Sequence, residues 1–302
     1  MIHQSQPSID YNALKDLARE IRLDILESTT KAGSGHPSSC WSAVEILVAL
    51  FFARFSSRHG VLYRQGILRY HPEDPWWPER DRFIMSKGHS VPAQYVALAM
   101  AGIFPLDELA TLKELGSRLQ GHPAMHFTPG LEGCTGSLGQ GLSFANGMAL
   151  AARIKGLSYR VYCLLGDGEL HEGQVWEAAM TASRCGLSNL TAIVDANRLK
   201  AMDDASTCCK PLAPVAERWA GFGWFVRDID GHHMAEICSA LDWASSVESG
   251  PAVVVAHTVK GKGVSFIENQ PGFHNSSLSD EQYAKAVAEL EANLEARSEA
   301  IP

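Results

Sequence analysis

From residue 160 onward, short apolar runs alternate with longer helical stretches, and this alternation constrains the fold more than any other feature of the chain. The apolar runs are rich in β-branched residues and are expected to be strands, at 160–165, 190–195, 224–229 and 252–258. Helices are expected between them, at 173–185, 211–221 and 234–247. Such a repeat implies an α/β fold, a three-layer α/β/α arrangement in which helices cover both faces of a mainly parallel sheet.

The first 155 residues carry a different pattern. An amphipathic helix is expected at 11–31, and the nearly all-apolar segment 41–55 reads as a buried helix. Residues 56–80 read as irregular and are followed by further short elements, namely a strand at 82–86 and helices at 91–101 and 105–115. A glycine-rich loop at 121–141 leads into a helix that ends near 155.

The C-terminal segment reads as an exposed helix at about 279–300. Ser279 can cap its first turn, and Gln282 three residues later can complete a capping box. The chain has 302 residues, shows no internal repeat and contains no low-complexity linker. We therefore expect a single domain over 1–302.

Charge and composition exclude several classes of protein. The formal net charge of −8 argues against binding to nucleic acid or to an anionic membrane. The apolar stretch 43–53 is too short to cross a bilayer, and residues 1–12 lack the pattern of a signal peptide. The seven cysteines lack CxxC spacing, which favours reduced thiols in a cytoplasmic protein over disulfides or structural zinc.

Polar residues follow two neighbouring strands of the expected sheet. Gly166-Asp167-Gly168 comes directly after the strand at 160–165, and Asn197 follows the next strand. Asp167 and Asn197 therefore reach the same edge of the sheet, where parallel sheets bind ligands. Carboxylate and amide oxygens suit Mg²⁺, and the following helix N-terminus can bind a diphosphate. A turn capped by Asp167 is the simpler alternative, but the matching position of Asn197 favours a metal site.

Together with other segments, these residues resemble the transketolase family. The glycine–aspartate turn with an Asn 30 residues later is the diphosphate and metal motif of thiamine diphosphate enzymes. Further transketolase-like segments occur in the right order: GSGHP at 33–37, SKGHS at 86–90, GHP at 121–123 and TGSLGQG at 135–141. The resemblance covers most of residues 14–280 and is to the N-terminal, diphosphate-binding domain of the family.

The resemblance implies how thiamine diphosphate and its metal would be held. Asp167 and Asn197 would bind Mg²⁺ through their side chains, and Leu199 would add its backbone carbonyl. Gly168 and His89 would lie along the diphosphate.

Other matching positions would surround the reactive part of the cofactor. Gly136 and Leu138 would sit near its aminopyrimidine and thiazolium rings. His36, His122 and His274 would be the catalytic side chains that line the substrate channel. Neutral imidazoles suit this role, because near neutral pH they exchange protons and hydrogen-bond sugar hydroxyls.

Several weaker candidates remain open. Lys260 or Lys262 could contact the diphosphate, or both could belong to an ordinary basic loop. Glu172 resembles an acidic residue at the subunit interface near the cofactor. A metal-binding pair of His122 and His126 is disfavoured, because Pro123 places them in a loop.

The resemblance also implies a partner, because full-length transketolases carry a second half with the Glu that activates the aminopyrimidine. We expect the A-type subunit of a split transketolase, which transfers a two-carbon ketol unit between a ketose phosphate and an aldose or aldehyde. It would be active only with a separate C-terminal-half subunit, in a heterotetramer of two chains of each kind. The alternatives are another thiamine diphosphate enzyme subunit, such as a deoxyxylulose-phosphate synthase, and a non-catalytic cofactor-binding module.

Overall fold

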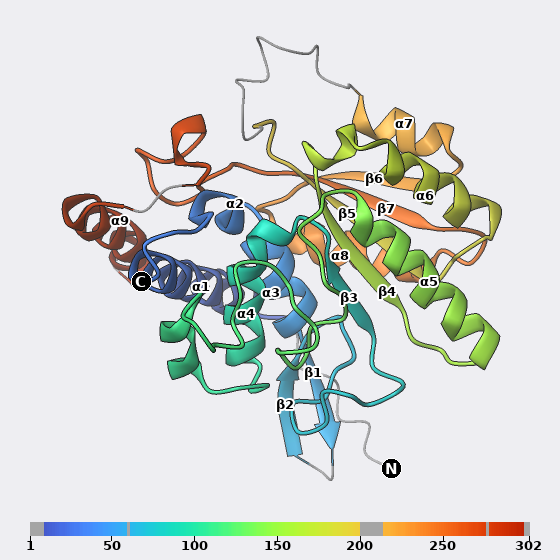
Figure 1. The fold of residues 1–302 in the computed structure, drawn as a ribbon, viewed down its shortest axis with the longest axis horizontal. Helices are drawn as coiled ribbons and strands as arrows, with labels where there is room; N and C mark the ends of the chain where they lie inside the picture. Colours follow the sequence, from blue (N-terminus) through green and yellow to red (C-terminus); the bar gives the residue numbers. More distant parts are fainter. Residues whose placement is uncertain (1–8, 59–60, 200–213, 276–277, 299–302) are drawn as a thin grey trace.

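The computed structural model describes residues 9–58, 61–199, 214–275 and 278–298. Its centre is a five-stranded sheet in which every neighbouring pair of strands is parallel. The strands stand in the order β3 (Arg82–Met85), β4 (Val161–Gly166), β5 (Leu190–Ala196), β7 (Ala252–His257) and β6 (Phe225–Asp230). The parallel sheet predicted from the alternating pattern is confirmed (Figure 1).

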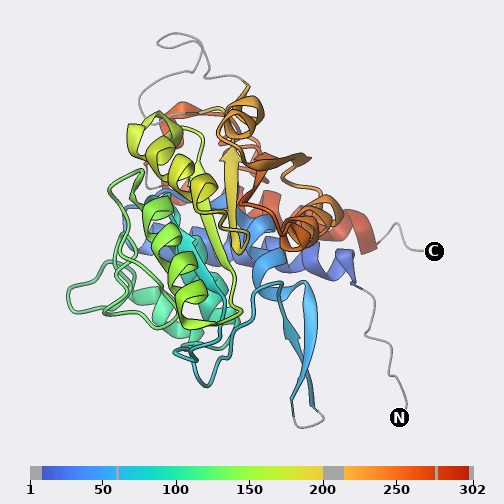
Figure 2. The same cartoon turned by 90° about the vertical axis from the view of Figure 1, so that its right-hand side faces the viewer.

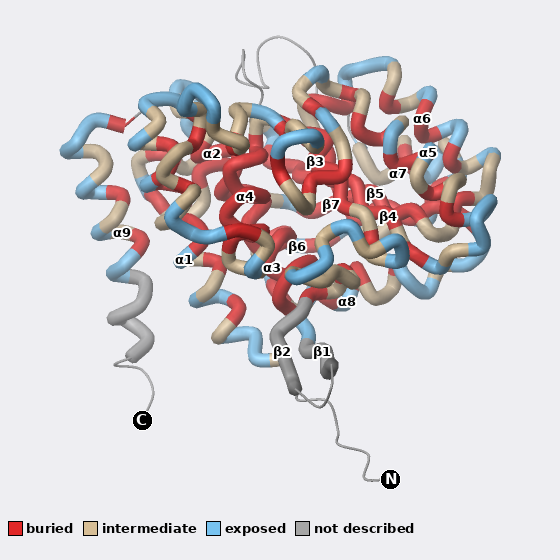
Figure 3. The backbone as a smooth tube through the Cα atoms, turned by 60° about the horizontal axis from the view of Figure 1, so that its bottom comes forward, coloured by how far each residue is buried: buried red, intermediate tan, exposed pale blue. Residues whose placement is uncertain are grey.

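Helices cover the sheet on both faces, and the strands show why. Cys163 and Leu165 of β4 point into one apolar core, whereas Tyr162 and Leu164 point into the other. The first core is closed by α5 (Gln140–Lys155), α6 (Gly173–Arg184) and α7 (Val215–Gly221). The second is closed by α1 (Tyr11–Lys31), α3 (Val44–Phe52), α4 (Val91–Met100) and α8 (Met234–Ser246). Figure 3 shows this buried interior between the exposed outer faces of the helices.

The register of the strands brings separate motifs to one edge. Gly166, the last residue of β4, pairs with Asp195, which in turn pairs with Ala256 of β7. The turn after β4, Asn197 after β5 and the segment after β7 therefore leave the sheet side by side. This edge is the carboxyl end of the strands, where α/β sheets bind ligands.

The helices predicted at 11–31 and at 279–300 both begin with a capping residue, and the second of these caps was predicted from the sequence. Asp10 precedes α1, and its Oδ1 accepts hydrogen bonds from the N–H groups of Asn12 and Ala13 at 3.0 and 3.1 Å. Before α9 (Asp280–Ser298), Ser279 Oγ accepts from the N–H of Gln282 at 3.2 Å. Gln282 Oε1 accepts from the N–H of Ser279 at 3.0 Å, so the capping box is formed.

The buried helix predicted at 41–55 is confirmed only at 44–52, and its predicted bounds are wrong. The chain forms α2 (Pro37–Trp41), turns at Ser42 and Ala43, and continues as α3. At the turn, Ser42 Oγ donates to Asp195 Oδ2 at 2.6 Å, a contact with the sheet edge. The apolar pattern of the segment cannot show this contact, because Asp195 is remote in the sequence.

Further predictions need correction. The segment 56–80, predicted to be irregular, begins with strands: β1 (Arg54–Arg58) and β2 (Val61–Gln65) pair antiparallel and stand away from the body (Figure 2). The helix predicted at 105–115 is a short 3₁₀-helix, η2 (Leu106–Thr111), which ends where Leu112 adopts an extended ψ of 123°. The helix predicted at 211–221 begins at Val215, and residues 200–213 lie outside the described part.

No helix among the described residues has the length and apolar character needed to cross a membrane. Cys40, Cys163 and Cys238 are buried free thiols. Cys208 and Cys209 lie outside the described residues.

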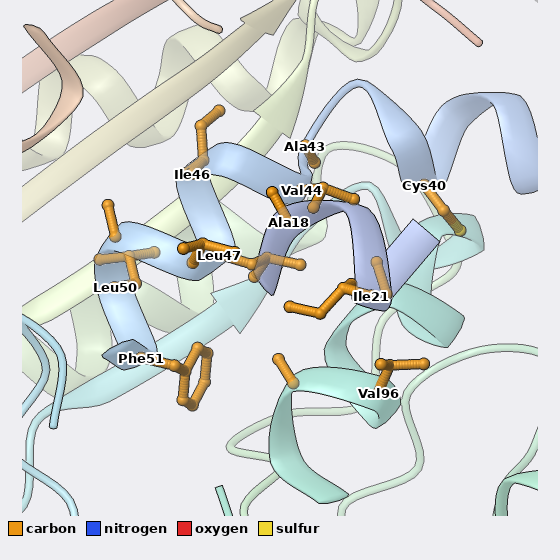
Figure 4. Close-up of a cluster of buried hydrophobic side chains, with 14 of the residues drawn as sticks. Ala18, Ile21, Cys40, Ala43, Val44, Ile46, Leu47, Leu50, Phe51 and Val96 are labelled. Atoms are coloured by element: carbon orange, nitrogen blue, oxygen red, sulfur yellow. The ribbon is translucent and has the colours of Figure 1, made fainter. Parts of the chain in front are cut away.

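The packing of α1 to α4 makes the largest apolar cluster, and Figure 4 shows part of it. Ile21 of α1, Leu47 of α3 and Val96 of α4 meet there, and all three are fully buried. We expect Leu47→Ala to lower the free energy of unfolding by about 2–5 kcal/mol, because it leaves a cavity among these helices.

The matched control is Leu115→Ala, because the side chain of Leu115 is fully exposed. Its effect is expected to stay within about 0.5 kcal/mol. Urea unfolding of the two variants measures the difference, and equal losses would contradict the packing described for α3.

Candidate functional site

A cavity of about 300 Å³ opens at the carboxyl edge of the sheet. Its walls come from motifs that follow strands, together with residues from α2 and the segment before α9. Most of the site residues predicted from the sequence line it: His89, Leu138, Asp167, Gly168, Asn197, Leu199, Lys260 and His274. The sheet therefore gathers in one place residues that are widely separated along the chain.

Asp167 and Asn197 are held by backbone N–H groups of the two turns that follow β4 and β5. Asp167 Oδ1 accepts from the N–H of Gly168 at 2.8 Å, and Oδ2 accepts from the N–H of Arg198 at 2.5 Å. Asn197 Oδ1 accepts from the N–H of Leu199 at 3.1 Å. Arg198 has a φ of 62°, which is uncommon for a residue other than glycine. Backbone strain of this kind persists where the surrounding structure requires it. Here the strained conformation turns the N–H of Arg198 toward the Asp167 carboxylate.

The charge of Asp167 is unfavourable in the protein alone. Burial, and then the negative charge of Asp195, raise the pKa of the Asp167 carboxyl to about 6. A bound cation has the opposite effect, because it stabilises the ionised carboxylate. One carboxylate, one amide oxygen and nearby backbone oxygens form a donor set that fits a hard divalent cation. Among the described residues, no group of three or more His, Cys, Asp or Glu side chains offers an alternative metal site.

A buried ion pair forms the floor of the cavity. Lys87 is 1% exposed, its Nζ contacts the Asp195 carboxylate, and it also donates to the carbonyl of Ser39 at 3.0 Å. Asp195 accepts further hydrogen bonds from Ser42 and Thr258. Burial alone would raise the pKa of Asp195, but the Lys87 ammonium and these hydrogen bonds lower it. The charge of Lys87 is therefore already balanced within the protein.

Lys260 is a second buried cation, and its charge is less fully balanced. It is 1% exposed, and its Nζ contacts His274 Nδ1. Within the described part of the chain, no carboxylate lies within 4.0 Å of its ammonium group. Burial, and then the charge of Lys87, lower the pKa of Lys260 to about 8, although the charges of Asp167 and Asp195 act in the opposite direction. A buried cation without a direct counter-ion is costly, so the cavity favours an anionic ligand such as a diphosphate.

Of the two lysines considered from the sequence, only Lys260 reaches the cavity. Lys262 lies at the surface, where its Nζ is 3.7 Å from Glu268 Oε1. Gly261, whose φ is +80°, makes a turn between the two lysines, and only the lysine before this turn lines the cavity.

Three imidazoles form a cluster beside the cavity. The ring centres of His36, His89 and His274 lie between 5.1 and 5.5 Å apart. Burial and the neighbouring lysines lower the pKa of His36 and of His274 to about 4, and they also lower the pKa of His89. The three rings are therefore neutral near pH 7, so they can accept protons and hydrogen-bond hydroxyl groups.

His122 lies next to this cluster without lining the cavity. A Cβ placed on Gly136 would come within 3.0 Å of the His122 ring, so the two loops touch. A Cβ on Gly88 would lie 2.8 Å from the backbone nitrogen of Gly136. The contacts between these loops therefore require glycine at both positions.

Glu172 is placed differently from the other predicted residues. It is exposed, does not line the cavity, and precedes the first turn of α6. Its side chain packs against Gly139, where a Cβ would lie 2.8 Å from Glu172 Cβ.

Some residues of the site were missed by sequence reasoning, although they belong to the recognised motifs. Besides Lys87, the cavity is lined by Ser39, Glu169 and His171. Glu169 Oε1 accepts from the N–H of Gly139 at 2.8 Å and from Ser86, and its Oε2 accepts from the N–H of Gly166 at 3.1 Å. Glu169 thus joins three loops, a role that its position after Gly168 could have suggested.

Lys113 places a further positive charge at the entrance to the histidine cluster. Its φ is 63°, its Nζ donates to Ser34 Oγ at 2.6 Å, and its side chain covers Gly121. Ser34 is two residues from His36, and Gly121 directly precedes His122. The ammonium group therefore lies between the loops that carry these two histidines, and it helps to lower the pKa of both.

Comparison with known proteins identifies the group to which this arrangement belongs. The family described as "Transketolase, thiamine diphosphate binding domain" matches residues 13–299. The subunit SqwG of the 6-deoxy-6-sulfo-D-fructose transketolase of Clostridium sp. (strain MSTE9) is 42% identical over 287 residues, which cover 95% of this chain and 98% of that protein. One of the subunits of the apulose-4-phosphate transketolase of Phocaeicola vulgatus is 38% identical, over 91% of this chain and 92% of that protein.

A solved structure shows the same arrangement within a longer chain. The transketolase of Campylobacter jejuni superposes with a TM-score of 0.83 at 30% sequence identity. The match covers 93% of this chain but only 43% of that protein. This chain therefore spans less than half of a full-length transketolase, whereas it matches the two bacterial proteins above over nearly their whole length.

The lysine at the cluster entrance can be tested through the histidines. We expect Lys113→Gln to raise the imidazole pKa of His36 above about 4, because losing a nearby positive charge favours the protonated ring. The pKa of His122 should rise as well. A pH titration followed by NMR of the imidazole resonances measures both. Lys31→Gln, at an exposed lysine that ends α1, is the control, and an unchanged His36 pKa in Lys113→Gln would contradict the placement.

Proposed function

The chain belongs to the transketolase family, and from that premise we propose that it is the thiamine diphosphate-binding subunit of a split transketolase. In this proposal it transfers a two-carbon ketol unit from a ketose phosphate to an aldose or aldehyde, together with a separate partner chain. One observation carries the proposal: the cavity combines the Asp167–Asn197 oxygen pair with the buried ammonium of Lys260, which no carboxylate of the described residues contacts directly. A metal-bound diphosphate meets both requirements.

In this proposal different residues of the cavity bind the metal ion and the diphosphate. Asp167 and Asn197 hold Mg²⁺ through their side-chain oxygens, and Leu199 contributes its backbone carbonyl. Lys260, His89 and the backbone at Gly168 bind the diphosphate, whose charge balances the Lys260 ammonium. Gly136 and Leu138 lie along the rings of the cofactor.

Bound thiamine diphosphate supplies the stabilisation of negative charge that breaking a carbon–carbon bond next to a carbonyl requires. The protein supplies orientation and proton transfer. His36 and His274, neutral near pH 7, accept or donate protons at the sugar hydroxyls and bind them in the channel. His122, beside the Gly136 loop, acts on the same substrate from the outer side of the channel.

A second chain is proposed because related proteins of this length are named as subunits. That chain supplies the remaining half of a transketolase, in an assembly of two chains of each kind. Exposed apolar side chains gather on the Gly-rich loop and on the outer faces of α5 and α6: Phe127, Phe144, Ile154 and Met180. Large apolar side chains on neighbouring helices favour burial in an interface. Glu172 precedes α6 and would lie at the margin of that contact.

The metal assignment predicts a specific loss. Asp167→Asn should weaken Mg²⁺-dependent binding of thiamine diphosphate by at least about tenfold, which corresponds to about 1.4 kcal/mol. Isothermal titration calorimetry with and without Mg²⁺ measures this loss. Asp107→Asn, an exposed carboxylate remote from the cavity, is the matched control. Equal affinity of Asp167→Asn and the unmodified chain would rule the assignment out.

The partner assignment predicts conditional activity. The purified chain should bind thiamine diphosphate with Mg²⁺ yet release no aldose from a ketose phosphate. Activity should appear when a chain corresponding to the second half of a transketolase is added. A coupled assay for the released aldose, titrated with the second chain, measures this dependence. Full activity of the chain alone would contradict the proposed split.

A further inference from the structure

A second polar network lies next to the cavity but does not line it. Arg22 of α1 and Glu45 of α3 are 6% and 7% exposed and form an ion pair, with Arg22 Nη2 at 2.7 and 2.8 Å from the two carboxylate oxygens. Glu45 Oε2 is also 3.0 Å from Nδ1 of His232, which follows β6. The Glu45 carboxylate therefore contacts both the Arg22 guanidinium and the His232 imidazole.

The other nitrogen of that imidazole fixes its tautomer. The backbone N–H of Val259 donates to His232 Nε2 at 2.8 Å. A backbone N–H can only donate, so Nε2 carries the lone pair and Nδ1 keeps the proton. Nδ1–H then donates to Glu45. Both ring nitrogens are used, and the ring links the buried ion pair to the backbone after β7.

That backbone segment carries the buried cation of the cavity. Lys260 directly follows Val259, and its carbonyl accepts from the N–H of Asn269 at 2.9 Å. Gly261 donates its N–H to the carbonyl of Ser38 at 2.9 Å. The chain is thus fixed on both sides of Lys260, by His232 before it and by Ser38 after it.

The need for such fixation follows from the electrostatics. A buried lysine ammonium without a direct carboxylate partner is costly, and a long flexible side chain can carry its charge back to water. A fixed backbone limits this movement, because it sets the point from which the side chain reaches into the cavity. The Arg22–Glu45 pair is buried and bidentate, so it provides a rigid support for the His232 ring.

We propose that His232 is a positioning residue for the cofactor: its hydrogen bond to Val259 holds the Lys260 ammonium in the cavity, and the Arg22–Glu45 pair orients its ring. The inference rests on the proposed function, because the anion that Lys260 awaits is the diphosphate. His232 itself does not line the cavity and is not a catalytic residue.

Two amide variants separate the two hydrogen bonds of the ring. The side-chain nitrogen of His232→Asn can take the place of Nδ1 and still donate to Glu45, but it leaves Val259 without an acceptor. The longer His232→Gln can present its oxygen where Nε2 was and accept from Val259. We expect His232→Asn to weaken Mg²⁺-dependent thiamine diphosphate binding by about tenfold and His232→Gln by no more than about twofold. Calorimetry gives the affinities, and thermal unfolding without ligand gives the stability of each variant.

A cofactor-independent measurement completes the test. Reductive methylation followed by mass spectrometry reports how accessible the Lys260 amine is in the unliganded chain. Lys260 should react faster in His232→Asn than in the unmodified chain, and His232→Gln should protect it. Equal reactivity in all three chains would overturn the proposal, as would affinity losses that follow thermal stability in both variants. If the unmodified chain binds no thiamine diphosphate even with the second transketolase chain present, while the methylation pattern holds, the proposed function fails and the role of His232 in holding Lys260 stands.

Discussion

The buried ion pair between Lys87 and Asp195 is the interaction on which the rest of the site depends. Asp195 is the residue of β5 that pairs with Gly166 of β4, and its carboxylate also binds Ser42 at the turn between α2 and α3. The pair therefore joins the loop after β3, the central strand and an N-terminal helix. Removing one partner would leave an uncompensated charge in the interior, which typically costs about 3–5 kcal/mol. The loops of the cavity take their positions from this junction.

The cavity uses two buried lysines in different ways. Asp195 neutralises Lys87, which becomes a structural element, whereas Lys260 lacks a direct carboxylate partner among the described residues and is, in the proposed function, a binding group. Burial, and then the same positive charges, keep His36 and His274 unprotonated, because both oppose a charge on the rings. One arrangement thus produces both an attraction for anions and a set of neutral imidazoles. A diphosphate would satisfy the first property, and a polyhydroxylated carbonyl substrate would use the second.

The backbone that carries the Lys260 ammonium is supported by hydrogen bonds from outside the cavity. The network of Arg22, Glu45 and His232 connects two helices of the second core to the backbone next to Lys260. The Glu169 carboxylate plays a similar part on the other side, where it binds the N–H groups of Gly139 and Gly166. The oxygens of these carboxylates are taken up by hydrogen bonds within the protein, so the carboxylates hold loops of the site in place.

The sequence by itself determined the parallel sheet, most helices and the shared edge of Asp167 and Asn197, because periodicity and strand–helix order are local properties that fix where each strand ends. It also determined the family, through motifs with defined spacing. It did not determine the break at Ser42, the hairpin at 54–65 or the choice of Lys260 over Lys262. Tertiary structure decided these, since each depends on a contact or a backbone turn that no local pattern encodes: Ser42 with Asp195, strand with strand, and the left-handed Gly261. The difference in charge balance between Lys87 and Lys260 is likewise visible only in the structure, where Asp195 contacts Lys87 directly and acts on Lys260 only at longer range.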